Sequence, residues 1–264
     1  MNDTPRVVGY ELRGAVALIT LNRPEALNSF DGPLRTQLGA SLQRAAAEAQ
    51  VRSVVLTGAG RAFSAGADLK AMGAARADGE EVSRQLNEEY GLGIRAILDM
   101  AKPVIAAVEG LVAGIGCAFV LASDLVVIAE DSYFTLPFHN IGLVPDGGIN
   151  WLLERQIGAR RAYEFAVDCT RVGAARCHEL GLANRVVAKG SAVETALQWA
   201  ERLAQRAPLA LQHTKRLLRE ANGATFAHSY RSEVETQSQC IDSEDFREGV
   251  AAFLQKREPR FKGS

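Results

Sequence analysis

The sequence predicts an α/β core followed by a region made of helices alone. Segments typical of buried strands alternate with helical patterns along most of the chain, and no strand pattern remains after about residue 191. Alternating strands and helices favour an α/β fold, and a closing run of helices favours an appendage. A chain of 264 residues, 47% of them hydrophobic, is long enough for both. We therefore predict a core over residues 1–195 and a helical region over residues 196–264.

Short apolar segments mark the predicted strands of the core. The four clearest segments are residues 15–21, 53–57, 103–108 and 125–129. Each is a mostly apolar run of the length expected for a buried strand. The first run ends at Asn22-Arg23-Pro24, where proline removes a backbone donor and stops the ladder.

Helical patterns lie between and after these strands. The first helix should begin after Asp31, an N-cap residue type. Its apolar stripe recurs every four residues, at Leu34, Leu38, Leu42 and Ala46. Further helices are predicted over residues 84–99, over residues 116–122 and directly after Gly148. Residues 71–81 mix glycine, alanine and charges without a period, which predicts a mobile surface loop.

Composition excludes several classes of function. The net charge of -1 gives no basic field for nucleic acid or an anionic membrane. The 4 cysteines form no CxxC pair, so we expect no zinc site and reduced thiols in a cytoplasmic protein. The uncharged stretch 110–123 is shorter than the roughly 18 to 20 residues of a spanning helix. Residues 1–6 carry no apolar stretch of signal-peptide type.

Two segments could bring a ligand against main-chain N–H groups. Small residues within 61–69 would let a ligand approach the backbone, although a tight connection packed on the sheet explains them too. Residues 110–118 open an apolar helix with glycines, and a helix N-terminus suits a developing oxyanion. Close helix–strand packing is the equal alternative. Both segments lack a dinucleotide-binding fingerprint, because Phe63 and Phe119 replace its third glycine.

A third segment, residues 134–148, places Asp146 in apolar surroundings. Desolvation would raise the pKa of this carboxyl and make it a proton carrier near neutral pH. The pattern alone favours a simpler role, in which Asp146 caps the helix that follows. His139 is a further candidate acid or base, for which a structural, hydrogen-bonded role is favoured.

These segments together resemble the crotonase superfamily, that is, the enoyl-CoA hydratase/isomerase family. The matching stretches are 21–28, 62–69, 102–108, 110–124, 141–148, 246–249 and 252–257. They are collinear over nearly the whole chain, which makes the resemblance specific. It implies a crotonase-like spiral of ββα units that binds acyl-CoA, followed by a C-terminal helical trimerisation region. The implied assembly is a homotrimer or a dimer of trimers, with coenzyme A entering as part of the substrate and no permanently bound cofactor or metal.

The resemblance also assigns site residues. The backbone N–H groups of Ala67 and Ile115 would form an oxyanion hole for the thioester oxygen. The positions that match the substrate and coenzyme A groove are Glu25, Ala26, Leu27, Ala65, Ala67, Asp68, Leu69, Ile115 and Phe138. Phe253 and Lys256 match C-terminal positions that reach coenzyme A, in some members across a subunit boundary, and Lys256 would face a phosphate.

The reaction depends on which carboxylates are present. Hydratases of this family use two glutamates, and the matching positions here are Ala118 and Phe138, which cannot move protons. Asp146 matches an acid found in isomerases that resemble the ring-opening and double-bond-shifting enzyme of phenylacetyl-CoA breakdown. We therefore predict an enoyl-CoA isomerase with Asp146 as proton shuttle. An enoyl-CoA hydratase that adds water to a 2-enoyl thioester, a dehalogenase-like thioester hydrolase (which Phe138 disfavours) and a catalytically silent acyl-CoA-binding protein remain open.

Overall fold

A parallel sheet forms the centre of the molecule in the computed structural model, which describes residues 6–74 and 78–264. Its six strands lie in the order β1 (Val8–Arg13), β2 (Val16–Leu21), β3 (Ser53–Gly58), β5 (Val104–Val108), β7 (Leu125–Ala129) and β10 (Arg185–Val187). β1 runs antiparallel to β2, and every other neighbouring pair is parallel. The four predicted strands are confirmed as β2, β3, β5 and β7, whose apolar runs are buried on both faces.

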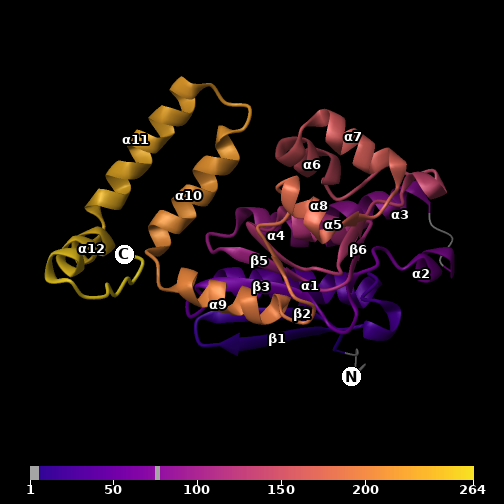
Figure 1. Cartoon of the computed structure of the whole chain (residues 1–264), viewed down its shortest axis with the longest axis horizontal. Coiled ribbons are helices and arrows are strands. Elements are labelled where there is room, and N and C mark those ends of the chain that lie inside the picture. Colours follow the sequence, from indigo (N-terminus) through magenta and orange to yellow (C-terminus); the bar gives the residue numbers. More distant parts are fainter. Residues whose placement is uncertain (1–5, 75–77) are drawn as a thin grey trace.

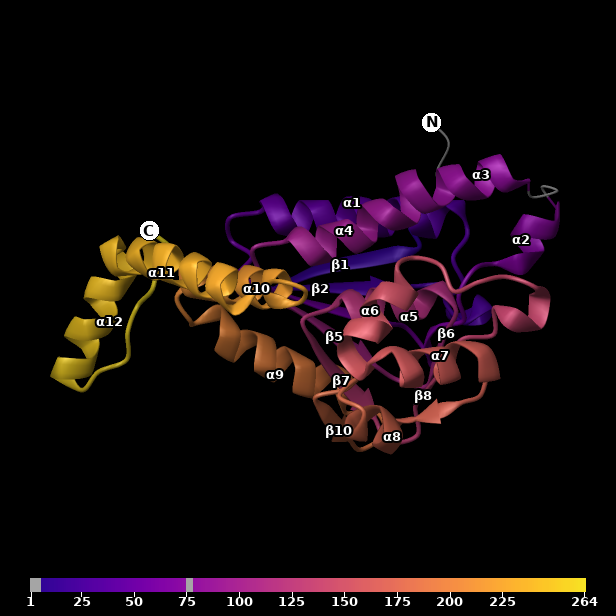
Figure 2. The same ribbon diagram turned by 90° about the horizontal axis from the view of Figure 1, so that it is seen from above.

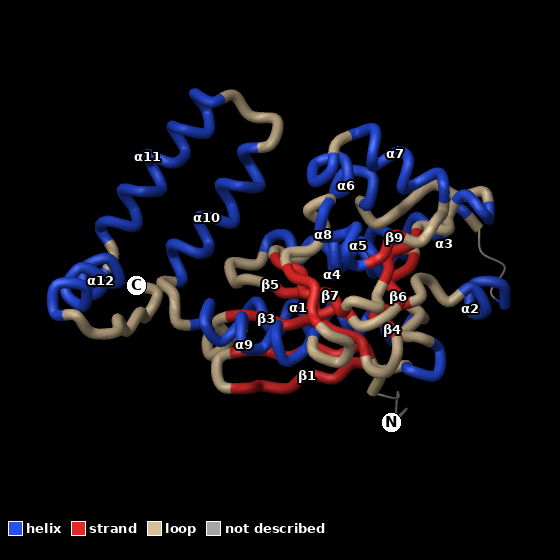
Figure 3. Tube along the Cα trace, viewed as in Figure 1, coloured by secondary structure: helices blue, strands red, loops and turns tan. Residues whose placement is uncertain are grey.

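A second sheet of short strands lies beside the first (Figure 3). Its strands are β4 (Ala62–Ser64), β6 (Leu111–Ala113), β8 (Tyr133–Thr135) and β9 (Val172–Gly173). β4, β6 and β8 each follow a long strand of the first sheet and precede a helix, which gives successive ββα units. The predicted crotonase-like α/β architecture is therefore confirmed. The sequence analysis did not identify the short strands, because two or three residues carry no measurable period.

The helix α1 (Gly32–Ala47) begins where the sequence predicted it. The Asp31 side chain accepts a hydrogen bond of 2.9 Å from the N–H of Leu34, so the predicted N-cap is confirmed. The buried stripe ends at Ala45 and not at the expected Ala46, which is exposed. A helix has 3.6 residues per turn, so steps of four drift away from the core within three turns.

The predicted loop over residues 71–81 is wrong for most of its length. Two short helices, α2 (Leu69–Ala74) and α3 (Gly79–Arg84), occupy it, and residues 75–77 lie outside the described residues. Asp78 caps α3 by accepting from the N–H of Glu81 at 2.8 Å. The predicted helix over 84–99 contains a π-helical segment, η2 (Gln85–Tyr90), before the regular α4 (Gly91–Asp99).

The remaining helices follow in chain order. They are α5 (Ile115–Ala122), α6 (Ile149–Ile157), α7 (Ala159–Asp168), α8 (Ala174–Glu179), α9 (Ala192–Ala204), α10 (Pro208–Ala221), α11 (Phe226–Asp242) and α12 (Glu244–Gln255). The chain is helical from α9 onward, as predicted. α9 packs on the larger sheet, whereas α10, α11 and α12 extend away from it (Figures 1 and 2).

The predicted domain boundary between residues 195 and 196 falls inside α9. Ala196 and Leu197 of this helix are buried against strand residues such as Val55 and Ile105, so α9 belongs to the core. The part that leaves the core begins with α10. Over the described residues, no helix combines the length and the apolar character that crossing a bilayer requires.

Candidate active site

Two loops meet where neighbouring parallel strands of the small sheet end. β4 pairs with β6 in parallel, so the segments that follow them emerge side by side. A Cβ atom placed on Gly66 would lie 2.9 Å from the carbonyl oxygen of Ala113, and one on Gly114 would lie 3.6 Å from the Cα of Gly66. Gly66 has a φ of +90°, which other residues rarely adopt. Glycine therefore allows the two backbones to touch.

Each loop presents a backbone N–H without a protein acceptor. The N–H of Phe30 donates to the carbonyl of Gly66 at 2.8 Å, and the N–H of Asp68 donates to the carbonyl of Phe30 at 3.1 Å. This pairing leaves the N–H of Ala67 on the opposite edge. Ile115 is the first residue of α5, where an N–H has no intrahelical acceptor. Within residues 6–74 and 78–264, neither N–H is hydrogen-bonded.

A buried polar network fixes the first loop. The Asn28 side chain is fully buried, accepts from the N–H of Arg23 at 2.8 Å and donates to the carbonyls of Ala59, between β3 and β4, and of Ala62, at the start of β4. The Ser64 hydroxyl donates to the carbonyl of Asn28 at 2.8 Å and accepts from the N–H of Gly66 at 3.1 Å. The sequence analysis assigned neither side chain a role. Asn28 also has a φ of 54°, a conformation that asparagine tolerates better than most residues.

Asp68 holds the same loop from the other side. Its carboxylate lies 3.1 Å from the Arg23 guanidinium and accepts hydrogen bonds from the Ser29 hydroxyl and the N–H of Ala71. Burial raises the pKa of Asp68, but the hydrogen bond from Ala71 and the charge of Arg23 outweigh it and lower the pKa below its usual value. The bond from the N–H of Ala71 makes Asp68 the cap of α2, and contact of Asp68 with coenzyme A stays a prediction.

Asp146 lies on a tight turn that rests on the first turns of α5. Gly147 has a φ of +61°, and a Cβ there would lie 2.7 Å from Cδ1 of Ile115 and 2.9 Å from Cβ of Ala118. The hypothesis that Asp146 caps the following helix is wrong. Gly148 is the N-cap residue of α6, and no side chain caps this helix. The two glycines adopt left-handed conformations, so the helix begins only at Ile149.

The Asp146 carboxylate is a desolvated acid. Its Oδ1 atom is buried and has no hydrogen-bond partner among the described residues. Burial raises the pKa of Asp146 to about 6, with a partial offset from the N–H of the same residue. Burial also raises the pKa of the nearby Tyr90 to about 12, and the negative charge of Asp146 contributes to that rise. A carboxyl with a pKa near 6 can both accept and return a proton near neutral pH.

Ala118 and Phe138, which the resemblance matches to the two hydratase glutamates, are both buried apolar side chains. Ala118 lies against the Asp146 turn through Gly147, and the Phe138 ring lies beside Gly114. His139 is exposed at the start of the 3₁₀ turn η3 (His139–Ile141) and makes no side-chain hydrogen bond within the described chain. The structural role expected for His139 is therefore not observed.

Only some of the residues predicted to bind coenzyme A lie close together in the structure. Residues 25–27 form and follow the 3₁₀ turn η1 (Pro24–Ala26), and the N–H of Ala65 donates to the carbonyl of Leu27 at 2.9 Å. Leu69 is exposed at the start of α2. Phe253 and Lys256 lie on and after α12, at the opposite end of the molecule from α2 (Figure 1). Within one chain they do not approach this site.

The chain is similar to known proteins over nearly its whole length. The family profile described as Enoyl-CoA hydratase/isomerase matches residues 11–264. A probable enoyl-CoA hydratase of Rhodobacter capsulatus is 38% identical over 97% of this chain and 98% of its own length. The 1,2-epoxyphenylacetyl-CoA isomerase of Escherichia coli K12 is 36% identical over 94% of this chain and 95% of its own.

Solved structures show the same fold. The crystal structure of an enoyl-CoA hydratase from Polaromonas sp. JS666 superposes with a TM-score of 0.91 at 36% sequence identity, over 96% of this chain and 99% of that one. The profile match spans both free N–H groups, the turn that carries Asp146 and the C-terminal helices. The chain therefore belongs to the enoyl-CoA hydratase/isomerase family.

Proposed function

We propose that this protein is an enoyl-CoA isomerase that shifts a double bond along the acyl chain of a coenzyme A thioester. The observation that carries the proposal is the desolvated Asp146 carboxylate, on a turn packed against Ile115 and Ala118. A single carboxylate of this kind is sufficient for an allylic shift. Water addition would need a second proton-transferring group, and Ala118 and Phe138 supply none.

The reaction starts from a 3-enoyl thioester with Asp146 ionised. The carboxylate removes a proton from C2, and the electron pair of that C–H bond moves into the carbonyl to give a dienolate. The N–H groups of Ala67 and Ile115 hold the negative thioester oxygen, and each such donor typically contributes about 3 to 4 kcal/mol of transition-state stabilisation. Asp146 then returns the proton to C4, and the double bond ends between C2 and C3.

The comparisons support an enoyl-CoA hydratase or isomerase reaction without separating the two. The relative named 1,2-epoxyphenylacetyl-CoA isomerase supports isomerase chemistry, whereas relatives named as hydratases make enoyl-CoA hydration the second candidate. The apolar residues at positions 118 and 138 favour isomerisation. The acyl group stays open, with aromatic, medium-chain and terpenoid chains as candidates, and a homotrimer or dimer of trimers stays a prediction.

The test is proton NMR of the protein with 3-hexenoyl-CoA and with crotonyl-CoA in deuterated water. We expect conversion of the 3-enoyl to the 2-enoyl thioester, with proton exchange at C2 and C4, and hydration of crotonyl-CoA slower by at least about 100-fold. Asp146→Asn should lower the isomerisation rate by about 10² to 10⁴, the usual contribution of a general acid–base, and retain binding of the thioester. Fast hydration without isomerisation would assign the hydratase reaction instead.

A matched control is Asp131→Asn. Asp131 is an exposed aspartate that pairs with Lys189 at 2.8 Å, and it lies outside the proposed site. This variant should isomerise like the unmodified protein. If neither protein exchanges substrate protons although both bind the thioester, the chain is a silent acyl-CoA-binding protein and the proposed reaction is wrong.

A further inference from the structure

Tyr90 is a polar side chain in an apolar part of the molecule. It is the last residue of the π-helical segment η2 and the buried residue of that segment. Segments of π-helix are rare and often lie at functional sites. Ile94 follows four positions later in α4, so the two side chains lie on one face of a continuous helix.

The Tyr90 ring lies between the two halves of the candidate active site. On one side it meets Phe30 edge-on, with the ring centroids 5.6 Å apart, and the backbone of Phe30 pairs with the loop of Ala67. On the other side, Ile94 of the same helix face lies against the turn that carries Asp146. The charge of Asp146 also helps to raise the pKa of the Tyr90 hydroxyl, so the two groups are near each other. Tyr90 therefore lies beside the space proposed for the acyl chain.

The Tyr90 hydroxyl has no acceptor for its proton within the described chain. Over residues 6–74 and 78–264, its oxygen has no hydrogen-bonded partner at ordinary distance, and it is not among the side-chain atoms that are buried without one. The hydroxyl therefore reaches accessible space. The nearest charged neighbour, Arg35, lies 5.3 Å from the ring centroid, and a guanidinium can only donate.

Arg35 is held in place and strengthens this hydroxyl as a donor. Its Nε atom pairs with Glu89 at 2.6 Å, and its Nη1 atom donates to the carbonyl of Phe30 at 3.4 Å. A positive charge beside the phenolic oxygen polarises the O–H bond. Burial, helped by the charges of Asp146 and Glu89, raises the pKa of Tyr90 to about 12 although Arg35 lowers it. The hydroxyl therefore keeps its proton at neutral pH.

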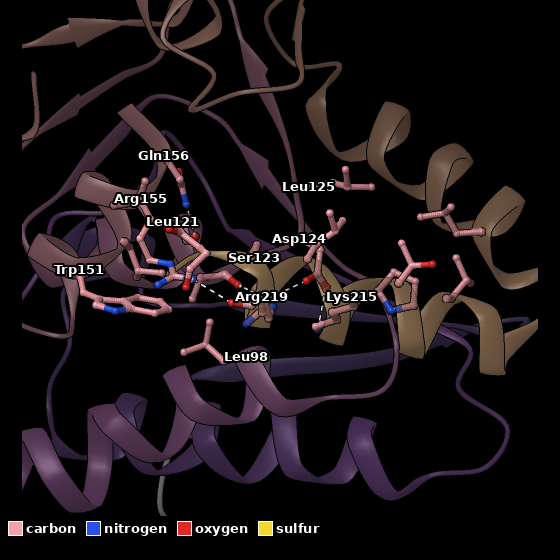
Figure 4. A pocket seen from close by; sticks show the side chains of 18 residues that line it. Leu98, Leu121, Ser123, Asp124, Leu125, Trp151, Arg155, Gln156, Lys215 and Arg219 are labelled. Carbon is pink, nitrogen blue, oxygen red and sulfur yellow. Dashed lines mark hydrogen bonds and ion pairs between the residues drawn. The ribbon is translucent and has the colours of Figure 1, made fainter. Parts of the chain in front are cut away.

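A cavity of about 450 Å³ between α10 and the core shows the contrasting case (Figure 4). Its lining includes the charged residues Asp124, Lys215 and Arg219. These residues pair with one another, because the Asp124 carboxylate accepts from Lys215 at 2.8 Å and from Arg219 at 2.7 Å. The chain supplies the partners there, whereas the acceptor for the Tyr90 hydroxyl has to come from water or from a ligand.

We propose that the Tyr90 hydroxyl donates a hydrogen bond to an oxygen atom in the acyl chain of the substrate, so that the site selects thioesters with an oxygen function beyond the thioester carbonyl. The inference rests on the proposed function, which places the acyl chain beside Asp146. A hydrocarbon chain would displace water from the hydroxyl and leave it unpaired, which is costly. A site with such a donor therefore discriminates against chains that lack an acceptor.

The test compares the binding of hexanoyl-CoA with that of 4-oxohexanoyl-CoA and 5-oxohexanoyl-CoA, whose ketone oxygens can only accept. Isothermal titration calorimetry of the unmodified protein should show at least one ketone binding about ten-fold tighter than hexanoyl-CoA, the effect of a hydrogen bond that is otherwise left unmade. In Tyr90→Phe, which keeps the ring against Phe30, this preference should vanish. Equal affinities in the unmodified protein, or a preference that survives in Tyr90→Phe, would overturn the inference.

Tyr10→Phe is the matched control. The Tyr10 hydroxyl donates to Glu48 at 2.8 Å, between β1 and the end of α1, so its loss should leave the ketone preference unchanged. Infrared spectroscopy with an isotope-labelled ketone carbon adds a direct readout of the bond. The ketone stretching band of the bound thioester should lie at lower frequency in the unmodified protein than in Tyr90→Phe, because a hydrogen bond weakens the C=O bond. Identical frequencies would show that Tyr90 does not donate to the ketone.

Failure of this inference can be told apart from failure of the proposed function. The ligands are saturated and the readout is binding, so the result does not depend on whether the protein shifts a double bond. If 3-hexenoyl-CoA is isomerised but neither ketone gains affinity, the reaction stands and the inference is wrong. If none of the three saturated thioesters binds, the site does not hold an acyl-CoA and both are wrong.

Discussion

Burial gives the Asp146 carboxyl both an unpaired oxygen atom and a raised pKa. Its Oδ1 atom lacks a partner, and the loss of hydration raises the pKa of the carboxyl to about 6. The neighbouring Ile115 contributes its backbone to the proposed oxyanion hole and its side chain to the surface under the Asp146 turn. A partly buried acid that opposes folding is a common feature of functional sites, where a perturbed pKa is used in catalysis.

The pH dependence of catalysis follows from this pKa. The proposed first step needs ionised Asp146, so kcat/KM should be low in acid and rise as the pH passes about 6. A stopped-flow or spectrophotometric pH profile between 4.5 and 8 (roughly the range around the expected midpoint) checks this. A flat profile through pH 6 would remove Asp146 from the role of base.

The same shift predicts that Asp146→Asn stabilises the protein at neutral pH. The pKa of Asp146 is about 6 in the folded state, above its usual value of 3.8. The contribution of this carboxyl to the free energy of unfolding is therefore fully present below pH 3.8 and is lost as the pH rises through 6, where the folded state must hold a desolvated charge. The variant should therefore gain at most about 3 kcal/mol in the free energy of unfolding at pH 8, since one pKa unit is about 1.4 kcal/mol. The gain should vanish near pH 3.5, and urea unfolding at both values measures it.

At the scale of elements, α5 connects the two halves of the candidate site. All 8 of its residues are buried. Its first N–H lies beside the loop of Ala67, and the Asp146 turn rests on its Ile115 and Ala118 side chains. The small methyl group of Ala118 leaves room for the turn, and by resemblance the same position holds a glutamate in hydratases.

The packing of this turn predicts different effects at its two glycines. Gly147→Ala should lower kcat by about 10- to 100-fold, because a Cβ would overlap Cδ1 of Ile115 and displace Asp146 from its productive position. Gly148→Ala is the matched control, since Gly148 also has a positive φ, +79°, but nothing within 4 Å of a Cβ. Both variants carry backbone strain, so the steric effect is the difference between them. Steady-state kinetics with equal losses in both would contradict this account.

At the scale of the whole molecule, the helices α10, α11 and α12 leave the core and expose apolar side chains. Large exposed residues along α11 and α12 include Phe226, Tyr230, Phe253 and Leu254, and Phe253 is 82% exposed. Exposed apolar patches of this kind mark interaction surfaces. They support the predicted trimer, in which Phe253 and Lys256 could reach a neighbouring site that they cannot reach within one chain.

Phe253→Glu should therefore dissociate the assembly, because a charge would have to be buried in an apolar contact. We expect light scattering to show the mass of a monomer and the affinity for coenzyme A thioesters to fall together. Gln255→Glu is the control on the same helix, because Gln255 is already polar and exposed. An unchanged mass for Phe253→Glu would place α12 outside the subunit contact.

Sequence patterns predicted the features that depend on residues close together in the sequence. The apolar runs of β2, β3, β5 and β7, the Asp31 cap and the helical end of the chain are local features, and the ordered motifs identified the family. Only the tertiary structure showed the short strands, the glycine turn that prevents Asp146 from capping α6, and the cavity beside α10. A strand of three residues is defined by its partners, and the pKa of a carboxyl by its burial. Both depend on residues that are distant in the sequence and adjacent only after folding.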